Sequence, residues 1–184
     1  MKLNVGDEIN YTVSYLEMGA PPDFDWPSEP SSNMLVLESN NPPVRYFLSL
    51  YEVVGAEYEW TDKFLCSKKE VNDFLLHPKV TMFTFLKNGW TAGFFVLDKR
   101  KKNICDLAYF GLVPEVIGYG YGKYLLKFAI KESWAKKDIK LLTVNTNTLD
   151  HPKALPLYKK LGFKVTTNEN EMRILTRPRI SVNN

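Results

Sequence analysis

A run of closely spaced glycines constrains the fold of this chain more than any other feature. Three glycines alternate with other residues over positions 118–122. The residues before them, 105–113, are apolar and rich in strand formers, and residues 124–134 after them have the spacing of a helix. The glycines are therefore predicted to lie on a strand-to-helix turn. There, bare backbone N–H groups and the positive end of a helix dipole would form a cradle for a phosphate.

The spacing of the glycines excludes two common phosphate-binding loops. A P-loop requires Gly-x4-Gly-Lys-Ser/Thr, but Ile117 and Tyr124 stand where its first glycine and its hydroxyl residue belong. The dinucleotide fingerprint requires Gly-x-Gly-x-x-Gly, but Lys123 stands at its third glycine. The remaining pattern is x-x-Gly-x-Gly before an apolar helix. A closely packed turn without a ligand explains this pattern as well as a phosphate site does.

Length, composition and charge favour a globular protein without a nucleic-acid partner. The 184 residues suffice for one substantial core, so we expect a single domain. Hydrophobic residues make up 45% of the chain and aromatic residues 14%, which argues against disorder. The net charge is +3, and the 24 basic residues are spread along the chain instead of gathering on one element. Binding to DNA or RNA is therefore not expected.

The cysteines and histidines do not suggest a metal site. Cys66, Cys105, His77 and His151 lack the spacing of metal ligands, and nothing indicates disulfide bonds. The N-terminus lacks the apolar region of a signal peptide, and no apolar run approaches the length of a membrane span. We therefore expect a cytoplasmic location and no membrane partner.

The first part of the chain is predicted to hold two strands and two helices. These elements are strands at 11–18 and 34–38, a proline-rich loop at 20–32, and helices at 44–54 and 67–77. Gly55 closes the first helix. Ser67 and Glu70 have the spacing of a capping box that opens the second helix, and Pro78 ends it.

The second part alternates between strands and helices. The expected elements are strands at 80–86, 91–97, 104–113, 140–145, 163–167 and 171–176, and helices at 120–136 and 152–161. Asn88 and Gly89 form a hairpin signal between the first two strands. Asp150 or His151 is expected to cap the last helix, with Pro152 at its first position. The strand-helix-strand unit around 120–136 predicts parallel pairing of its two strands.

A second motif follows the glycine loop. Ala154-x-x-x-Tyr158-x-x-x-Gly162-Phe163 resembles the second signature of the GNAT acetyltransferases, and the glycine loop resembles their first. The two motifs stand in the order and at the distance typical of that superfamily. The resemblance covers about residues 80–167. Phrases such as Tyr109-Phe-Gly-Leu-x-Pro-Glu-x-Ile-Gly and Leu149-Asp-His-Pro-x-Ala-Leu are similar to those of a bacterial GNAT subgroup.

The resemblance implies an α+β GNAT fold that binds acetyl-CoA as a cosubstrate. In that fold a mixed, mostly antiparallel sheet with a splayed parallel pair is flanked by helices, and acetyl-CoA lies between the splayed strands. Residues 1–78 would form the acceptor side, and residues 79–177 the acyl-CoA-binding core, of one domain spanning 1–184. The cofactor-binding residues would be Leu112, Val113, Ile117, Gly118, Tyr119, Gly120, Tyr121, Gly122, Lys123, His151 and Tyr158. Ile117 departs from the usual Arg or Gln, and His151 from a frequent Asn.

The implied reaction is direct transfer of an acetyl group to a primary amine. An amine with a pKa of about 10 is protonated at neutral pH, so a base must remove its proton. Asp106 is the first candidate and Glu115 its rival, although Asp106 also suits a strand-edge residue paired with a lysine. A backbone N–H near Leu112 and Val113 would stabilise the oxyanion. Tyr158 would protonate the departing thiolate, although packing in the core is its default role.

The acceptor is not identified by any motif. Tyr51, Trp60, Asp62 and the proline-rich loop are candidates for the wall of its pocket, although core packing is the preferred explanation for the aromatic residues. A small-molecule amine and a protein amine both fit, and a homodimer is left open. The alternative to an enzyme is an acyl-CoA-binding sensor or interaction module of the same fold without catalysis.

Overall fold

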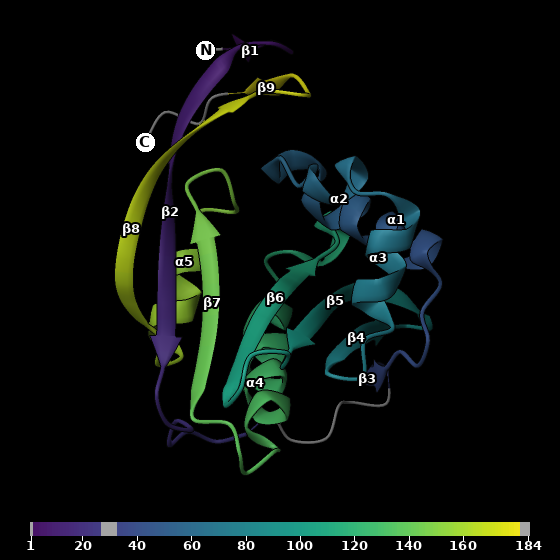
Figure 1. Ribbon diagram of the computed structural model, residues 1–184, viewed down its shortest axis with the longest axis vertical. Coiled ribbons are helices and arrows are strands. Elements are labelled where there is room, and N and C mark those ends of the chain that lie inside the picture. Colours follow the sequence, from purple (N-terminus) through teal and green to yellow (C-terminus); the bar gives the residue numbers. More distant parts are fainter. Residues whose placement is uncertain (1, 27–32, 181–184) are drawn as a thin grey trace.

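A seven-stranded sheet with the strand order β3-β4-β5-β6-β7-β2-β8 forms the centre of the protein (Figure 1). The computed structural model describes residues 2–26 and 33–180. The strands of this sheet are β2 (Glu8–Met18), β3 (Met34–Glu38), β4 (Val80–Lys87), β5 (Trp90–Asp98), β6 (Ile104–Leu112), β7 (Leu141–Asn147) and β8 (Lys164–Ile174). The short strands β1 (Lys2–Leu3) and β9 (Arg179–Ile180) pair separately.

Five α-helices accompany the described part of the sheet. They are α1 (Val44–Gly55), α2 (Asp62–Leu65), α3 (Lys68–Leu75), α4 (Tyr121–Trp134) and α5 (Ala154–Lys160). Two 3-10 turns, η1 (Ala56–Tyr58) and η2 (Pro114–Val116), follow α1 and β6. No helix in the ranges 2–26 and 33–180 has both the length and the apolar character needed to cross a membrane.

The two central strands, β6 and β7, run parallel and then separate. Their pairing extends only from Ile104 opposite Leu141 to Asp106 opposite Thr143. The other neighbouring strands of the sheet pair antiparallel. The predicted α+β class, with a mixed, mostly antiparallel sheet and a splayed parallel pair, is therefore confirmed.

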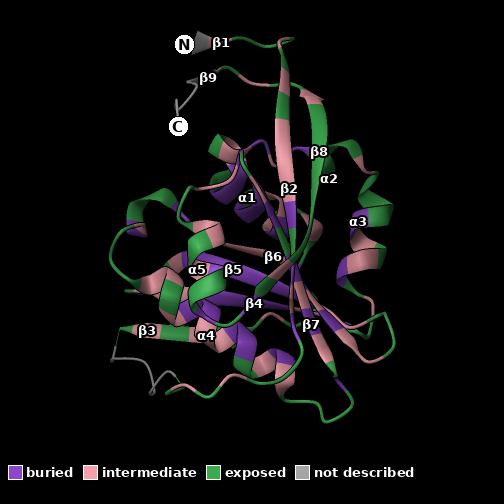
Figure 2. Ribbon diagram, turned by 90° about the vertical axis from the view of Figure 1, so that its left-hand side faces the viewer, coloured by how far each residue is buried: buried purple, intermediate pink, exposed green. Residues whose placement is uncertain are grey.

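Aromatic side chains that alternate along β5 fix the helices on the two faces of the sheet. The Phe94 ring packs edge-on against Phe47 of α1, with ring centres 6.0 Å apart. The next residue, Phe95, points to the opposite face and lies 6.4 Å from Phe128 of α4. Successive side chains of a strand point to opposite faces, so these contacts place α1 and α4 on different sides. Figure 2 shows α4 and α5 on one side of the sheet and α2 and α3 on the other.

The N-terminal strand β2 lies inside the sheet, between β7 and β8, instead of beside its neighbours in sequence. It pairs antiparallel with both strands over most of its length. Its alternating pattern predicts a strand, but not its partners. Residues 8–18 therefore help to build the half of the sheet that otherwise comes from the C-terminal part of the chain.

The prediction of two separate strands near the C-terminus is wrong, because β8 continues without a break. The polar residues between the predicted strands take part in the pairing with β2. Ser14 Oγ donates to Asn168 Oδ1 at 2.7 Å, and Thr12 Oγ1 donates to Asn170 Oδ1 at 2.9 Å. On an exposed strand such side-chain bonds replace apolar alternation, which is why the apolar pattern is lost there.

Helix boundaries follow the local capping chemistry. The predicted capping box is present at α3, where Ser67 and Glu70 exchange hydrogen bonds. Helix α5 begins at Ala154, and its N-cap position is Lys153, so neither Asp150 nor His151 caps it.

Of the predicted proline-rich loop, residues 20–26 form no helix or strand, and residues 27–32 lie outside the described part.

Candidate active site

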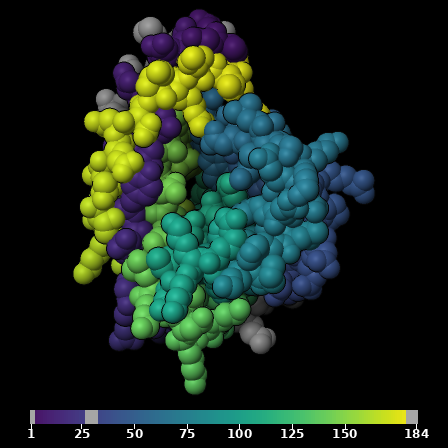
Figure 3. Space-filling model, in the orientation of Figure 1, coloured from purple at the N-terminus to yellow at the C-terminus, as the bar shows by residue number. Residues whose placement is uncertain are grey.

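A cavity of about 600 Å³ lies where β6 and β7 separate. Its walls come from the outer parts of β6, β7 and β2, the glycine loop, the residues before and within α5, the segment from α1 to the start of α2, and Arg173 of β8. Figure 3 shows the face on which it opens, between β2 and β7 on one side and the helices of residues 44–75 on the other. The separation of two parallel strands thus creates an elongated site with two chemically different ends.

The glycine loop forms one end of the cavity. Gly118 and Gly120 have positive φ angles of 94° and 85°. Gly120 is the N-cap residue of α4 and offers no side-chain cap, so the first N–H groups of that helix have no acceptor within it. These donors and the positive end of the helix dipole are suited to bind an anionic group.

The structure brings five of the seven predicted loop residues to the cavity. Ile117, Gly118, Gly120, Gly122 and Lys123 line it, whereas the two tyrosines do not. The Tyr119 side chain is 73% exposed and stacks on Tyr121, whose ring in turn packs 5.8 Å from that of Phe85. The tyrosines therefore point away from the cavity, which leaves the backbone between them accessible.

Leu112 and Val113 differ in the use of their backbone N–H groups. The Val113 N–H donates to the Ala92 carbonyl at 3.0 Å and is not free for a ligand. Leu112 lies opposite Gly93. Because hydrogen-bonded and non-bonded pairs alternate in an antiparallel ladder, the N–H of Leu112 points to the other side, toward the gap that opens next to β7. Of the two predicted donors, the geometry favours Leu112, which lines the cavity.

Tyr158 of α5 lies in the wall of the cavity near its middle. Its side chain is buried, and its ring packs against Phe110 of β6 and Phe163, with centres 6.2 and 5.7 Å away. Burial, and then the charges of Asp150 and Asp106, raise the pKa of the Tyr158 hydroxyl far above its ordinary value. The phenol is therefore protonated throughout the physiological range. Within the described residues, no acceptor for its hydroxyl is present.

His151 lines the cavity beside Tyr58, with ring centres 6.1 Å apart. Its Nδ1 accepts a hydrogen bond from the backbone N–H of Lys153 at 3.1 Å. A neutral imidazole bonded in this way carries its proton on Nε2, which is then a donor. The side-chain amide of an Asn at this position could donate the same hydrogen bond.

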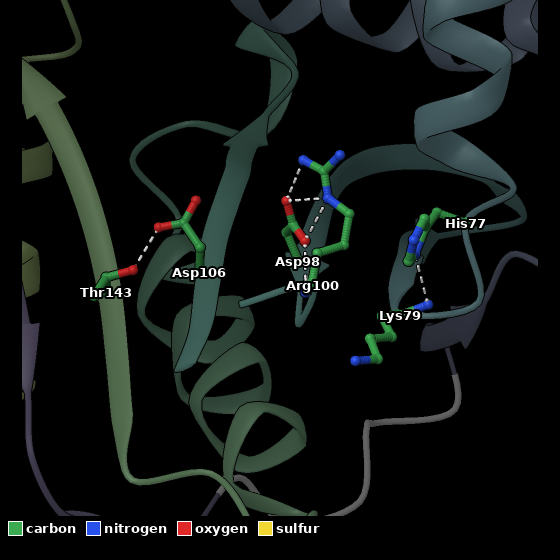
Figure 4. Close-up of polar contacts among 6 residues, drawn as sticks. All are labelled: His77, Lys79, Asp98, Arg100, Asp106 and Thr143. Atoms are coloured by element: carbon green, nitrogen blue, oxygen red, sulfur yellow. Dashed lines mark hydrogen bonds and ion pairs between the residues drawn. The ribbon is translucent and has the colours of Figure 1, made fainter. Parts of the chain in front are cut away.

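Asp106 lies at the last paired position of β6 and β7 (Figure 4). It directly precedes Leu107, the first residue of β6 that lines the cavity, but Asp106 itself is not a lining residue. Its Oδ1 accepts a hydrogen bond from Thr143 Oγ1 of β7 at 2.6 Å. On its other side it pairs across the sheet with Asp98, whose carboxylate turns away to bind Arg100. Burial is the main cause that raises the pKa of the Asp106 carboxyl, and the Thr143 hydrogen bond opposes it. No lysine pairs with Asp106 within the described residues.

Glu115, the predicted rival of Asp106, is not at the cavity. It lies in the 3-10 turn η2, its side chain is exposed, and it is not among the lining residues. The turn faces outward because Val116, the next residue, is the one that enters the core.

The other end of the cavity is formed by aromatic residues from α1, η1 and β6. Trp60 is the centre of this wall: its ring lies 5.4 Å from that of Tyr51 and 6.0 Å from that of Tyr109. Trp60 Nε1 donates to Asp150 Oδ1 at 3.1 Å, which ties the helical segment to the end of β7. Burial raises the pKa of Tyr51 to about 12, so its hydroxyl is uncharged at neutral pH. The predicted wall residues Tyr51, Trp60 and Asp62 all line the cavity.

Three further charged residues of the cavity were not predicted as site residues. Asp150 accepts hydrogen bonds from Thr146 Oγ1 and the Asn147 N–H, in addition to that from Trp60. Glu59 follows η1 and is 3% exposed, and Arg173 reaches the cavity from β8. Asp150 belongs to a phrase that the sequence analysis singled out, but no pattern in the sequence marks Glu59 or Arg173.

The position of Trp60 depends on Gly55, and this gives a first prediction. A Cβ added to Gly55 would lie 2.2 Å from Trp60 Cβ and 2.5 Å from its Cγ, too close for either to remain in place. Gly55 has φ −96°, which alanine adopts freely, so Gly55→Ala would normally stabilise a helix. We expect instead that overpacking lowers the free energy of unfolding by about 1–3 kcal/mol, seen as a lower Tm. We also expect a lower kcat/KM for the acceptor.

Gly19→Ala is the matched control for Gly55→Ala. No atom lies within 4 Å of a Cβ added at Gly19, and its φ is not positive. Its Tm and kcat/KM for the acceptor are expected to stay near the values of the unaltered protein. A Gly55→Ala protein as stable as the Gly19→Ala protein would show that Trp60 is not held against the end of α1.

A metal centre finds no support in the described structure. Within residues 2–26 and 33–180, no three His, Cys, Asp or Glu side chains are grouped closely enough to hold a metal ion. Cys105 is buried, and burial raises the pKa of its thiol.

Comparison with known proteins finds a family match in the second half of the chain and structural neighbours of the same fold. Residues 79–165 match the model of the family described as acetyltransferase (GNAT) domain. No curated protein matches the sequence. Among solved structures, a GCN5-related N-acetyltransferase from Kribbella flavida is 13% identical with a TM-score of 0.60, and the match covers 88% of this chain and 56% of that one. This chain thus spans little more than half of that neighbour's length.

This chain covers a larger share of two further structural neighbours than of the first. A GNAT family acetyltransferase from Elizabethkingia anophelis with acetyl-CoA bound is 20% identical with a TM-score of 0.52, over 74% of this chain and 80% of that one. An aminoglycoside acetyltransferase from an uncultured soil metagenomic sample is 14% identical with a TM-score of 0.56, over 73% of this chain and 93% of that one. At these identities the likeness establishes the fold.

Proposed function

We propose that this chain is an N-acetyltransferase that uses acetyl-CoA and a primary amine, because residues 79–165 match the model of the acetyltransferase (GNAT) domain. The observation that carries the proposal is the cavity between β6 and β7. It joins a loop of unpaired backbone donors at one end to a buried tyrosine and a wall of aromatic and acidic residues at the other. A thioester with an anionic tail and an amine would meet in its middle.

The diphosphate of the coenzyme would bind at the glycine loop. Ile117 supplies no polar side chain there, so the N–H groups of 118–123 and the Lys123 ammonium would hold it. The backbone of Leu112 would pair with the pantetheine arm and donate to the thioester carbonyl. His151 Nε2–H is placed at the lining of the same cavity and would supply a further donor to the coenzyme or the acceptor.

In the transfer step, the amine nitrogen attacks the thioester carbonyl and forms the C–N bond. The proton lost by the amine passes to Asp106, directly or through water. The C–S bond then breaks, and Tyr158 gives its proton to the departing thiolate. Asp106 is the proposed base because its raised pKa makes it a better proton acceptor than an ordinary carboxylate. Neither Asp106 nor Glu115 lines the cavity, but Asp106 directly precedes the lining residue Leu107 on β6, whereas Glu115 is exposed in the turn η2.

The direct test measures the release of free CoA thiol from acetyl-CoA in the presence of a panel of primary amines and lysine-containing peptides. The proposal expects amine-dependent release together with an acetylated product seen by mass spectrometry. Binding of acetyl-CoA with no product from any acceptor would indicate instead the non-catalytic acyl-CoA-binding module. Absence of acetyl-CoA binding would refute both.

Gly120→Ala tests the coenzyme end of the cavity. Gly120 has φ 85°, which a Cβ makes unfavourable by about 1–2 kcal/mol, and the new methyl group would stand at the loop where the diphosphate approaches. We expect the Kd for acetyl-CoA, measured by calorimetry, to rise about tenfold.

Gly89→Ala separates backbone strain from loss of the cradle. Gly89 has φ 87°, almost the same as Gly120, but it lies in the hairpin between β4 and β5, outside the cavity lining. It should lower the Tm as much as Gly120→Ala and leave the Kd unchanged. Equal Kd values for acetyl-CoA in the two variants would show that the glycine loop is not part of the coenzyme site.

A further inference from the structure

Glu59 is a buried carboxylate that the proposed reaction does not use. It lines the acceptor end of the cavity and is only 3% exposed. Within the described residues, its carboxylate receives one side-chain hydrogen bond, from Thr176 Oγ1 to Oε2 at 3.3 Å, and no lysine, arginine or histidine nitrogen lies within 4 Å of it. A carboxylate removed from water without a cation is unfavourable unless a ligand supplies the charge.

The surroundings hold Glu59 in place without neutralising it. Its backbone is left-handed, with φ 60°, an unfavourable conformation for a residue with a side chain. Arg173 stabilises this backbone conformation, because one nitrogen of its guanidinium group donates to the Glu59 carbonyl oxygen. The second guanidinium nitrogen pairs with Asp62 Oδ1 at 2.7 Å. The nearby positive charge is therefore matched by Asp62, and the Glu59 carboxylate remains for a ligand.

The charges that line the cavity are separated along its length. Lys123 and Lys153 lie at the coenzyme end, on the glycine loop and before α5. The acceptor end has three carboxylates, Glu59, Asp62 and Asp150, with the single guanidinium of Arg173. Electron-rich ring faces also favour cations, and this end contains several aromatic residues: Tyr11, Tyr51, Tyr58, Trp60 and Tyr109.

We infer that the acceptor carries a second positive charge besides the amine that is acetylated, and that Glu59 binds this second cation. This inference rests on the proposed function and specifies its substrate class: diamines and polyamines, or amines with a comparable second ammonium group. One amine is acetylated beside Tyr158, with Asp106 as the proposed base. The other remains protonated and is held by Glu59 against the Trp60 wall.

The test compares a linear α,ω-diamine with the n-alkylamine of the same chain length, in kcat/KM for acetyl transfer. A charge-assisted hydrogen bond in a buried site predicts a preference of about tenfold or more for the diamine, expressed mainly in KM. Glu59→Gln keeps the size of the side chain and its Thr176 partner but loses the charge. It should abolish the preference by lowering kcat/KM for the diamine to about the value for the monoamine.

Glu57→Gln is the matched control, because Glu57 lies two residues away, is exposed and does not line the cavity. It removes the same charge and should leave the preference intact. A wild-type protein without a preference for the diamine, or a Glu59→Gln protein that retains it, would overturn the inference while leaving the acetyltransferase in place.

A binding measurement separates failure of this inference from failure of the proposed function. The complex with CoA is titrated calorimetrically with the same diamine and monoamine, so no turnover is needed. The inference expects tighter binding of the diamine to the wild-type complex than to the Glu59→Gln complex. If acetyl-CoA is never turned over but this difference is present, the proposed reaction is wrong and the cation site stands. Equal affinities for the two amines would refute the cation site.

Discussion

Replacement of Tyr158 by Phe is expected to lower kcat by at least about hundredfold, because the thiolate then departs without a proton donor. Burial raises the pKa of the Tyr158 phenol, so the phenol carries its proton at neutral pH. The ring contacts with Phe110 and Phe163 do not involve the hydroxyl, so the fold should be unaffected. Single-turnover measurements would show whether the loss lies in the chemical step.

Two measurements exclude indirect effects of Tyr158→Phe. Its Tm and its Kd for acetyl-CoA should equal those of the unaltered protein. Tyr124→Phe, on α4 and outside the cavity lining, should leave kcat unchanged. Full turnover by Tyr158→Phe would assign the proton donor elsewhere, to His151 or to water.

Asp106→Asn is expected to lower kcat at neutral pH by about hundredfold, the typical contribution of a general base. Only the ionised carboxylate accepts a proton, so the rate of the unaltered enzyme should fall as the pH decreases through the raised pKa of Asp106. This acid limb of the pH–rate profile should disappear in the variant.

Stability distinguishes a catalytic role of Asp106 from a structural one. Burial raises the pKa of Asp106 in the folded state, so ionisation of this group destabilises the protein once the pH exceeds the unfolded-state pKa. Asn is neutral and its Oδ1 still accepts from Thr143, so at neutral pH the Tm should be unchanged or higher. Asp150→Asn provides the comparison: if it abolishes the acid limb and Asp106→Asn does not, Asp150 is the base.

The parts of the site that could be predicted from the sequence are those encoded by local motifs. The glycine loop and the first turn of α4 are set by neighbouring residues, because the positive φ values at Gly118 and Gly120 are intrinsic to glycine. Tyr158 was found because it belongs to a second motif at a suitable distance from the first. The separation of β6 and β7 follows from the strand-helix-strand unit that connects them.

The acceptor end could not be predicted, because tertiary contacts create it. Glu59 is exceptional only through its burial and its left-handed backbone, neither of which has a sequence pattern. Arg173 lies on an exposed, polar strand, where a charged residue is ordinary. The sequence does not distinguish Val113 from Leu112 as a backbone donor. The register of β5 and β6 does, because it pairs the Val113 N–H with the Ala92 carbonyl.

The placement of β2 between β7 and β8 determines when this protein acquires its site during folding. Thr12 bonds to Asn170, 158 residues further along the chain, and Ser14 to Asn168, 154 residues further. Closing such long loops is entropically unfavourable until many other contacts exist, so these pairings belong to the slow, late events. During synthesis on the ribosome, β2 can pair with β7 and β8 only after both of these strands have been made. A nascent chain will therefore have the glycine loop before the walls of the cavity are complete.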